Sequence, residues 1–245
     1  MSISPPEGSS SRVDGCWAAS LGDCRGGISG EHIISKSQFD TKSINSRGLP
    51  WCRGETKTVG LASLVANNLC SGHNSDLSPT DAEALRFRKA LEAVRADPST
   101  RFDQLIDARR LERWVLKTSI NLALQSPDSG LPLTPELVQQ AFGRNTPSRG
   151  QGLFIVTETG ETLGRPGHIY FETLRHGNDG PITLTVFRFH GLRLVYAFAG
   201  APAVNGALRL ERIRFPPHRI RLRWLPPFDA EDNVMKVDAG LPKQT

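Results

Sequence analysis

The sequence contains no long apolar run, no internal repeat and only four cysteines. No stretch approaches the roughly 20 apolar residues that a membrane-spanning helix needs, so we expect no membrane partner. The first eleven residues are rich in Ser, Pro and Gly and have no apolar segment, which predicts a disordered tail and no export signal. We therefore expect a cytoplasmic chain whose cysteines are thiols or metal ligands, because disulfides do not persist in a reducing compartment.

The composition is that of a globular protein with a modest positive charge. Hydrophobic residues make up 38% of the 245 residues and charged residues 22%, which suits one large domain or two small ones. Lys and Arg together number 30 against 25 acidic residues, a net charge of +5. An excess of this size agrees with nucleic-acid binding, but it is common in proteins that never bind nucleic acid. The charge therefore identifies no partner by itself.

One group of residues has the spacing of metal ligands. Cys16 and Cys24 come early, and Cys70 and His73 follow as a C-x2-H pair. Two cysteines followed by such a pair form a soft donor set that suits one tetrahedral zinc ion. The spacing between the first two cysteines is longer than the roughly two to four residues usual in zinc motifs. The sequence thus leaves open that Cys52 is the fourth ligand instead, and each cysteine alone would be read as a buried thiol.

A carboxylate, an imidazole and an amide lie inside the same frame, at Glu31, His32 and Asn74. With the cysteines they resemble an HNH endonuclease, the ββα-metal nuclease class, in its zinc-ribbon form. In that family an acidic residue and His end the first strand, and a Cys-x2-Cys pair followed by Asn or His opens the helix. Here Glu31-His32 matches the first element, and Cys70-x2-His73-Asn74 matches the second with His73 in place of the last cysteine. The resemblance covers roughly a third of the chain.

The resemblance implies a metal-dependent endonuclease that hydrolyses phosphodiester bonds. Its partner would be nucleic acid, and we expect DNA rather than RNA. His32 would be the general base, and Glu31 and Asn74 would hold a catalytic Mg²⁺ or Mn²⁺. A separate structural Zn²⁺ would be bound by Cys16, Cys24, Cys70 and His73. A neutral imidazole can take a proton from water near pH 7, and carboxylate and amide oxygens suit a hard divalent cation.

The sequence departs from the family at two places. The family often has Asp where this chain has Glu31, and it often has a middle Asn in the second strand. The candidates for that middle Asn are Ser63, Asn67 and Asn68.

Two other functions remain open at this stage. The zinc module could be non-catalytic and bind nucleic acid or protein, with Glu31 and His32 serving only the local fold and Asn74 capping a turn. Alternatively, the function could lie in the β-rich C-terminal half, as a surface for a partner or for oligomerisation.

Two helices are expected between the metal motif and the C-terminal half. The first should begin at Ser78-Pro79-Thr80-Asp81, which has a capping-box pattern with Pro at the first helical position. The second should span 102–124, with a buried stripe on one side. A basic ridge on this second helix reads as a solvated face slightly more than as a phosphate contact; it consists of Arg110, Arg113 and Lys117.

The C-terminal half has the alternation of β-strands. Strands are expected at 153–157, 168–174, 182–189, 192–198 and 219–224. In the last of these, Arg219, Arg221 and Arg223 should share one face, because side chains alternate along a strand. Four histidines in or beside these strands have no partnering pattern and are read as structural: His168, His176, His190 and His218.

These observations predict an α+β protein in which a zinc-stapled ββα-metal module, one closed by a zinc ion, is followed by packed helices and a β-rich region. The predicted segments are a disordered tail (1–14), the HNH-like module (15–98), a helical segment (99–146), the β-rich region (151–228) and a loose tail (229–245). The oligomeric state is left open.

Overall fold

The structure is a computed structural model of the whole chain. It describes residues 11–96, 103–125, 130–131, 133–148, 150–156, 168–175, 180–189, 192–198, 210–212, 220–223 and 236–238. Several expectations lie outside what the structure describes: the tail at 1–10, and the side chains of His168, His176, His190, His218, Arg219, Arg221 and Arg223.

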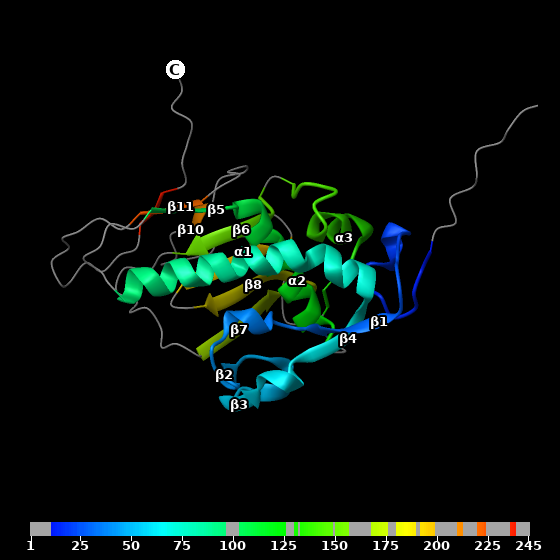
Figure 1. The fold of residues 1–245 in the computed structure, drawn as a ribbon, viewed down its shortest axis with the longest axis horizontal. Helices are drawn as coiled ribbons and strands as arrows, with labels where there is room; N and C mark the ends of the chain where they lie inside the picture. The colour runs from blue at the N-terminus through cyan, green and yellow to red at the C-terminus, as the bar shows by residue number, and fades with distance from the viewer. Residues whose placement is uncertain are drawn as a thin grey trace, which may run out of the picture.

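The first unit of the fold is two strands followed directly by a helix. Strand β1 (Ile28–His32) pairs antiparallel with β4 (Val65–Cys70), with a register shift between Ser29 and Glu31. Helix α1 (Ser71–Ala96) begins at the residue after β4 and runs across the front of the molecule (Figure 1). The pair β1–β4 and helix α1 are called the ββα unit below; Cys70 and His73 lie at its strand–helix junction, and β2 and β3 come between β1 and β4 in the chain.

Helix α1 begins at Ser71, eight residues before Pro79, which the capping pattern predicts as the first helical residue, so that prediction is wrong. Pro79 lies inside the helix and not at its first position. A proline here removes one backbone donor, and the Thr80 hydroxyl compensates locally by donating to the carbonyl oxygen of Leu77 at 2.7 Å. Asp81 does not cap the helix but turns toward the core, as described below.

The segment between β1 and β4 crosses to a second sheet. It contains β2 (Ser43–Arg47) and β3 (Lys57–Gly60), which pair antiparallel, and three short 3₁₀ turns. These turns are η2 (Lys36–Gln38), η3 (Pro50–Cys52) and η4 (Leu61–Ser63); a further turn, η1 (Ala19–Leu21), precedes β1. Strand β2 also pairs in parallel with β7 (His168–Arg175), so the insertion belongs to the large sheet.

The large sheet has the strand order β10-β6-β9-β8-β7-β2-β3. Its other strands are β6 (Gly152–Val156), β8 (Ile182–Phe189), β9 (Leu192–Ala197) and β10 (Leu210–Arg212). A three-stranded sheet joins β5 (Asp103–Ile106), β11 (Ile220–Arg223) and β12 (Lys236–Asp238). The five strands predicted for the C-terminal half are confirmed, and β12 lies in the segment expected to be loose.

Helix α2 (Ala108–Ala123) packs against α1 on one side and against β9 and β6 on the other, and α3 (Pro135–Ala141) packs beside it. The prediction of a helix from residue 102 is wrong at its start, because β5 occupies 103–106. Asp107 caps α2 by accepting hydrogen bonds from the backbone N–H groups of Arg109 and Arg110. The predicted buried stripe is confirmed; Leu111, Trp114, Val115, Thr118 and Leu122 are all buried.

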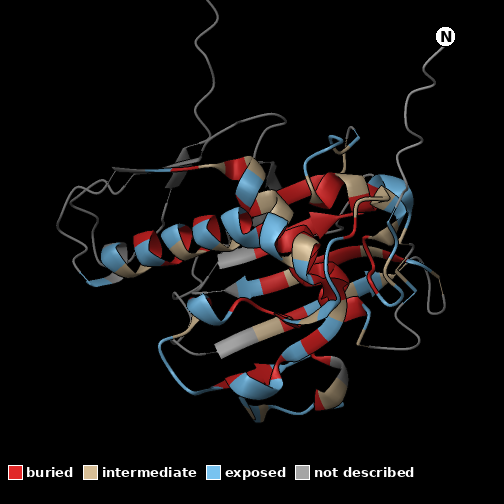
Figure 2. Ribbon diagram, turned by 45° about the vertical axis from the view of Figure 1, so that its right-hand side comes forward, coloured by how far each residue is buried: buried red, intermediate tan, exposed pale blue. Residues whose placement is uncertain are grey.

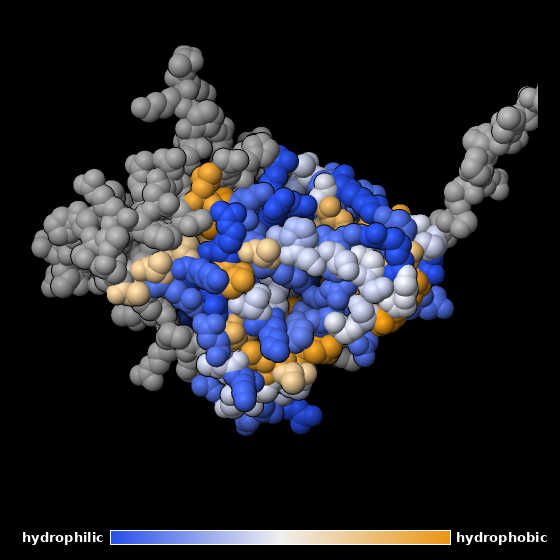
Figure 3. Space-filling view, in the orientation of Figure 1, coloured by the Kyte–Doolittle hydropathy of each residue, from blue (hydrophilic) through white to orange (hydrophobic). Residues whose placement is uncertain are grey.

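One core cluster runs from Cys16 to Phe198 and includes residues of the ββα unit, of α2 and α3, and of the large sheet. Figure 2 shows buried residues along the inward side of α1 and exposed ones along its outward side, and hydrophilic residues dominate the surface over α1 in Figure 3. The predicted segments therefore share a core.

Among the described residues no helix is long and apolar enough to span a bilayer.

Candidate metal centre and the adjoining polar cluster

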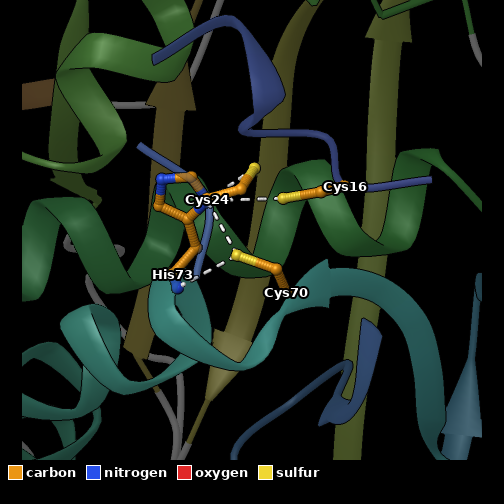
Figure 4. Close-up of side chains that lie close together, drawn as sticks. All are labelled: Cys16, Cys24, Cys70 and His73. Carbon is orange, nitrogen blue, oxygen red and sulfur yellow. Dashed lines mark hydrogen bonds between the residues drawn. The ribbon is translucent and has the colours of Figure 1, made fainter. Parts of the chain in front are cut away.

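Four side chains predicted as metal ligands converge at the start of α1. The donor atoms of Cys16, Cys24, Cys70 and His73 all lie within 4.8 Å of one another, and all four residues are buried (Figure 4). Nδ1 of His73 is 3.4 Å from Sγ of Cys16, 3.8 Å from Sγ of Cys24 and 3.2 Å from Sγ of Cys70. Residues separated by more than 50 positions in the chain are thus brought to one point.

Backbone hydrogen bonds hold the N-terminal segment against the β4–α1 junction. The N–H of Trp17 donates to the carbonyl of Asn68 at 2.9 Å, and the N–H of Gly72 donates to the carbonyl of Arg25 at 2.9 Å. Between the two cysteines, the turn η1 ends at Gly22, whose φ of +77° lies in a region that suits glycine. The long Cys16–Cys24 spacing is therefore accommodated by turns.

The donor set fits a tetrahedral soft-metal site. With zinc–sulfur and zinc–nitrogen bonds of about 2.3 and 2.0 Å, a tetrahedral ion separates sulfur from nitrogen by about 3.5 Å. The three distances from Nδ1 of His73 bracket that value. The four residues could therefore hold one metal ion, and three thiols with one imidazole are consistent with a structural zinc.

Cys52 does not take part in this cluster. It is buried in η3, where its Sγ lies 3.4 Å from Oγ of Ser46 and 3.5 Å from the Ser46 carbonyl oxygen. The alternative in which Cys52 replaces one of the ligands is not the arrangement of this structure.

The imidazole of His73 is oriented from behind. Its Nε2 lies 2.9 Å from Oδ1 of Asp23, whose other oxygen accepts a hydrogen bond from Arg144. The bond from Arg144 is the main cause that lowers the pKa of Asp23, so the carboxylate stays ionised. The ring of Phe142 packs against the imidazole edge-on, with centroids 5.0 Å apart. Carboxylates that hold the far nitrogen of a histidine ligand in this way fix its tautomer and direct the other nitrogen at the metal.

Two of the cysteines differ in acidity. Burial raises the pKa of Cys16 to about 11. Burial acts in the same direction on Cys70, but hydrogen bonds from the backbone of His73 and Arg25 and from the side chains of Cys16 and Cys24 together lower the pKa of that thiol. Since metal-bound cysteine is a thiolate, binding an ion here must displace the proton of Cys16.

A second buried polar cluster lies where α1 and α2 cross the end of β1. The Lys117 ammonium, which is 0% exposed, donates to Oε1 of Glu31 and to Oδ1 of Asp81, the latter at 2.8 Å. Oδ1 of Asp81 also accepts from the hydroxyl of Ser35, which in turn accepts from Nε1 of Trp114 at 2.9 Å. Burial raises the pKa of Glu31, and the Lys117 charge offsets only part of that rise.

Lys117 therefore corrects the sequence interpretation. It was placed in a solvated basic ridge, but it is fully buried and paired with two carboxylates. The other two members of that ridge do lie nearer the surface: Arg110 is exposed and Arg113 is half-buried.

His32 and Asn74 lie beside these clusters. His32 is half-buried at the end of β1 and makes no hydrogen bond or ion pair among the described residues. Its pKa is lowered by burial first, then by the charges of Lys36 and Lys117. Asn74, in the first turn of α1, donates from Nδ2 to Oγ of Ser29 on β1 at 3.2 Å. The amide is thus directed across the ββα unit toward the strand that carries Glu31 and His32.

The three candidates for the middle Asn have separate environments. Asn68 donates to Oδ1 of Asn121 in α2 at 3.1 Å, beside Nε1 of Trp17, which donates to the same oxygen at 3.2 Å. Asn67 is exposed on the outer face of β4, and Ser63 is exposed and donates to the carbonyl of Gly60. Asn68 therefore links the ββα unit to α2.

Four functional neighbours were not identified from the sequence: Asp23, Asp81, Lys117 and Arg144. Asp23 adjoins Cys24, and an acidic residue beside a candidate ligand is the one signal that the sequence offers; the other three reach the site only through the tertiary fold.

Comparison with known proteins found no match: no family model, curated protein or solved structure matches the chain.

Proposed function

We propose that the protein is a metal-dependent endonuclease of the ββα-metal type and that its substrate is DNA. The observation that carries the proposal is the position of Glu31-His32 at the end of β1 and of Asn74 in the first turn of α1, with β1, β4 and α1 in the required order. The Cys16, Cys24, Cys70 and His73 cluster at the β4–α1 junction supports it, because it would fasten that unit without using the catalytic groups.

His32 is suited to the role of general base. Its imidazole has no partner that would occupy the nitrogens among the described residues, and its lowered pKa favours the neutral form. A neutral imidazole accepts the proton of an attacking water near pH 7. Because His32 keeps part of its surface exposed at a strand end, a phosphodiester can approach it.

Glu31 and Asn74 offer the oxygens that a hard cation takes. The described contacts engage Oε1 of Glu31 and Nδ2 of Asn74, and they leave Oε2 and Oδ1 without partners. Asp81 adds a second carboxylate beside Glu31, so two carboxylates contact the one Lys117 ammonium. When bound there, Mg²⁺ or Mn²⁺ would neutralise charge on the scissile phosphate and on the departing oxygen.

The test is cleavage of plasmid DNA by the zinc-loaded protein with Mg²⁺ or Mn²⁺. His32→Ala should stay folded, keep its zinc and lose about 10²–10⁴ in rate, the usual loss of a general base. Asn74→Ala should weaken the binding of Mg²⁺ or Mn²⁺, so that a higher metal concentration partly restores cleavage. Added metal should not restore His32→Ala, because it supplies no base.

Ser75→Ala is the matched control, since this exposed neighbour of Asn74 only bonds the Ser71 carbonyl of its own helix. Glu31→Gln is a weaker test because it also breaks the contact with Lys117. Undiminished cleavage by His32→Ala would contradict the mechanism. A wild-type protein inert on every DNA and RNA form would favour a non-catalytic zinc module that binds nucleic acid or protein.

A further inference from the structure

A pocket of about 90 Å³ opens between α2 and the loop that follows α3. Helix α2 contributes Arg109, Glu112 and Arg113, and Gln140 comes from α3. The loop forms the rest of the wall with Gly143, Asn145, Thr146 and Pro147. The hollow thus combines two arginines and one glutamate with neutral groups, and none of these residues belongs to the metal centre or to the Lys117 cluster.

The two arginines stand on the same side of α2, because residues four apart are neighbours on a helix surface. Nε of Arg113 donates to the carbonyl of Arg109 at 3.2 Å. Its Nη1 reaches the loop at Gly143, where an added Cβ would stand only 2.4 Å away and where φ is +70°. The absence of a side chain at Gly143 therefore leaves room for the guanidinium of Arg113.

The pocket carries excess positive charge. The guanidinium of Arg109 makes no hydrogen bond or ion pair among the described residues. The carboxylate of Glu112 also lines the pocket, and its Oε1 accepts from the backbone N–H of Leu153 in β6 at 2.9 Å. The two arginines outnumber this one carboxylate. Burial is the main cause that lowers the pKa of Arg113; Asp107 and Glu112 act in the opposite direction, and repulsion from Arg110 and Arg109 adds to the lowering. An anion in the pocket would relieve this repulsion.

We propose that this pocket binds a phosphate group through Arg109 and Arg113. Arginine presents a planar fork of N–H donors that matches phosphate oxygens and stays charged at any physiological pH. Asn145 and Thr146 at the rim add neutral polar groups. The assignment does not depend on the nuclease activity proposed above.

The loop that lines the pocket is also fastened to the metal centre. Phe142 packs on His73 and Arg144 bonds Asp23, whereas the alternate residues Gly143 and Asn145 face the pocket. A metal ion at the cysteine cluster would therefore fix one side of the loop whose other side contacts the phosphate. For this reason the test uses the zinc-loaded full chain.

Inorganic phosphate is titrated into the protein and followed by the backbone N–H NMR signal of Gly143, which lines the pocket and is present in every variant. The signal should shift with a saturable dependence. Arg109→Gln and Arg113→Gln should each weaken binding about 10-fold or more, the loss of one charge-assisted contact. Arg110→Gln is the matched control, because it removes the same charge from an exposed position of the same helix outside the pocket. No saturation, or equal weakening in all three variants, would overturn the proposal.

A second titration distinguishes a backbone phosphate from a free phosphate compound. A short DNA oligonucleotide is bound at several salt concentrations. For a backbone phosphate, Arg109→Gln should weaken binding and reduce the salt slope by about one, while Arg110→Gln does not. If the pocket binds a free phosphate compound instead, Arg109→Gln should weaken the binding of inorganic phosphate and leave oligonucleotide binding unchanged. The side chain of Arg109 is half-exposed, so Arg109→Gln should fold normally. The oligonucleotide test therefore does not depend on whether Arg113→Gln folds.

Discussion

The β1–β4–α1 unit is held at two places by buried polar clusters of different kinds. At the first turn of α1, three thiols and an imidazole surround a point where a metal ion fits. Further along α1, Lys117 of α2 lies between the carboxylates of Glu31 and Asp81. The first cluster could hold an ion taken from solution, whereas the second contains its own cation from the neighbouring helix.

This difference assigns separate tasks to the two clusters. The metal centre attaches the N-terminal segment to the β4–α1 junction, and the structure there should depend on metal supply. The Lys117 cluster attaches the end of β1 and α1 to α2, and it should hold with or without metal. The following changes separate the two, from the largest expected effect to the smallest.

Cys70→Ser should have the largest effect, since it removes one ligand from the metal centre. A structural zinc contributes on the order of 10 kcal/mol to a small module, so most of that stabilisation should be lost. The variant should purify without zinc and lose the cooperative thermal transition of the ββα unit. Cys52→Ser is the control, because that buried thiol lies outside the cluster and should keep about one zinc per chain. Equal zinc content in both variants would remove Cys70 from the site.

Lys117→Met should cost about 3–5 kcal/mol of unfolding free energy, because it leaves two carboxylates in or near the core without their cation. Urea unfolding of the zinc-loaded protein measures this. Lys89→Met, at an exposed position of α1, should change stability by no more than about 0.5 kcal/mol. Adding Glu31→Gln and Asp81→Asn to Lys117→Met should recover part of the loss. If Lys117→Met is as stable as Lys89→Met, the ion pairs of Lys117 do not stabilise the attachment of β1 and α1 to α2.

Asp23→Asn should have the smallest of these effects and should act on metal affinity. Loss of a carboxylate behind a histidine ligand typically weakens metal binding about 10–100-fold, which a chelator competition can measure. Asp76→Asn is the control, since its carboxylate pairs with exposed Arg25 at 2.5 Å and does not contact His73. An affinity unchanged in Asp23→Asn would mean that the metal does not depend on this orientation of His73.

The convergence of Cys16, Cys24, Cys70 and His73 could be predicted because their chemistry shows in the sequence. Thiols are rare in this chain, and Cys70-x2-His73 lies at a strand–helix junction whose geometry presents both side chains to one side. The strands of the C-terminal half were also predictable, since alternation along β8 follows from burial of one face of the sheet.

The Lys117 cluster could not be predicted in the same way. A lysine beside two arginines on a helix has the pattern of a solvated face, and its partners lie 86 and 36 positions away. The start of α1 was missed because Ser78-Pro79 has strong capping chemistry, but strand β4 and the ligand pair already set the chain into helix at Ser71. In both cases tertiary contacts outweighed a local pattern.

The central claim is that Cys16, Cys24, Cys70 and His73 bind one metal ion that closes the ββα unit. X-ray absorption at the zinc edge, on protein purified without chelator, tests it most directly. The account predicts about one zinc per chain, with three sulfur neighbours near 2.3 Å and one nitrogen near 2.0 Å. A shell of four sulfurs, which would require Cys52, or a shell of oxygen and nitrogen alone, would contradict the account.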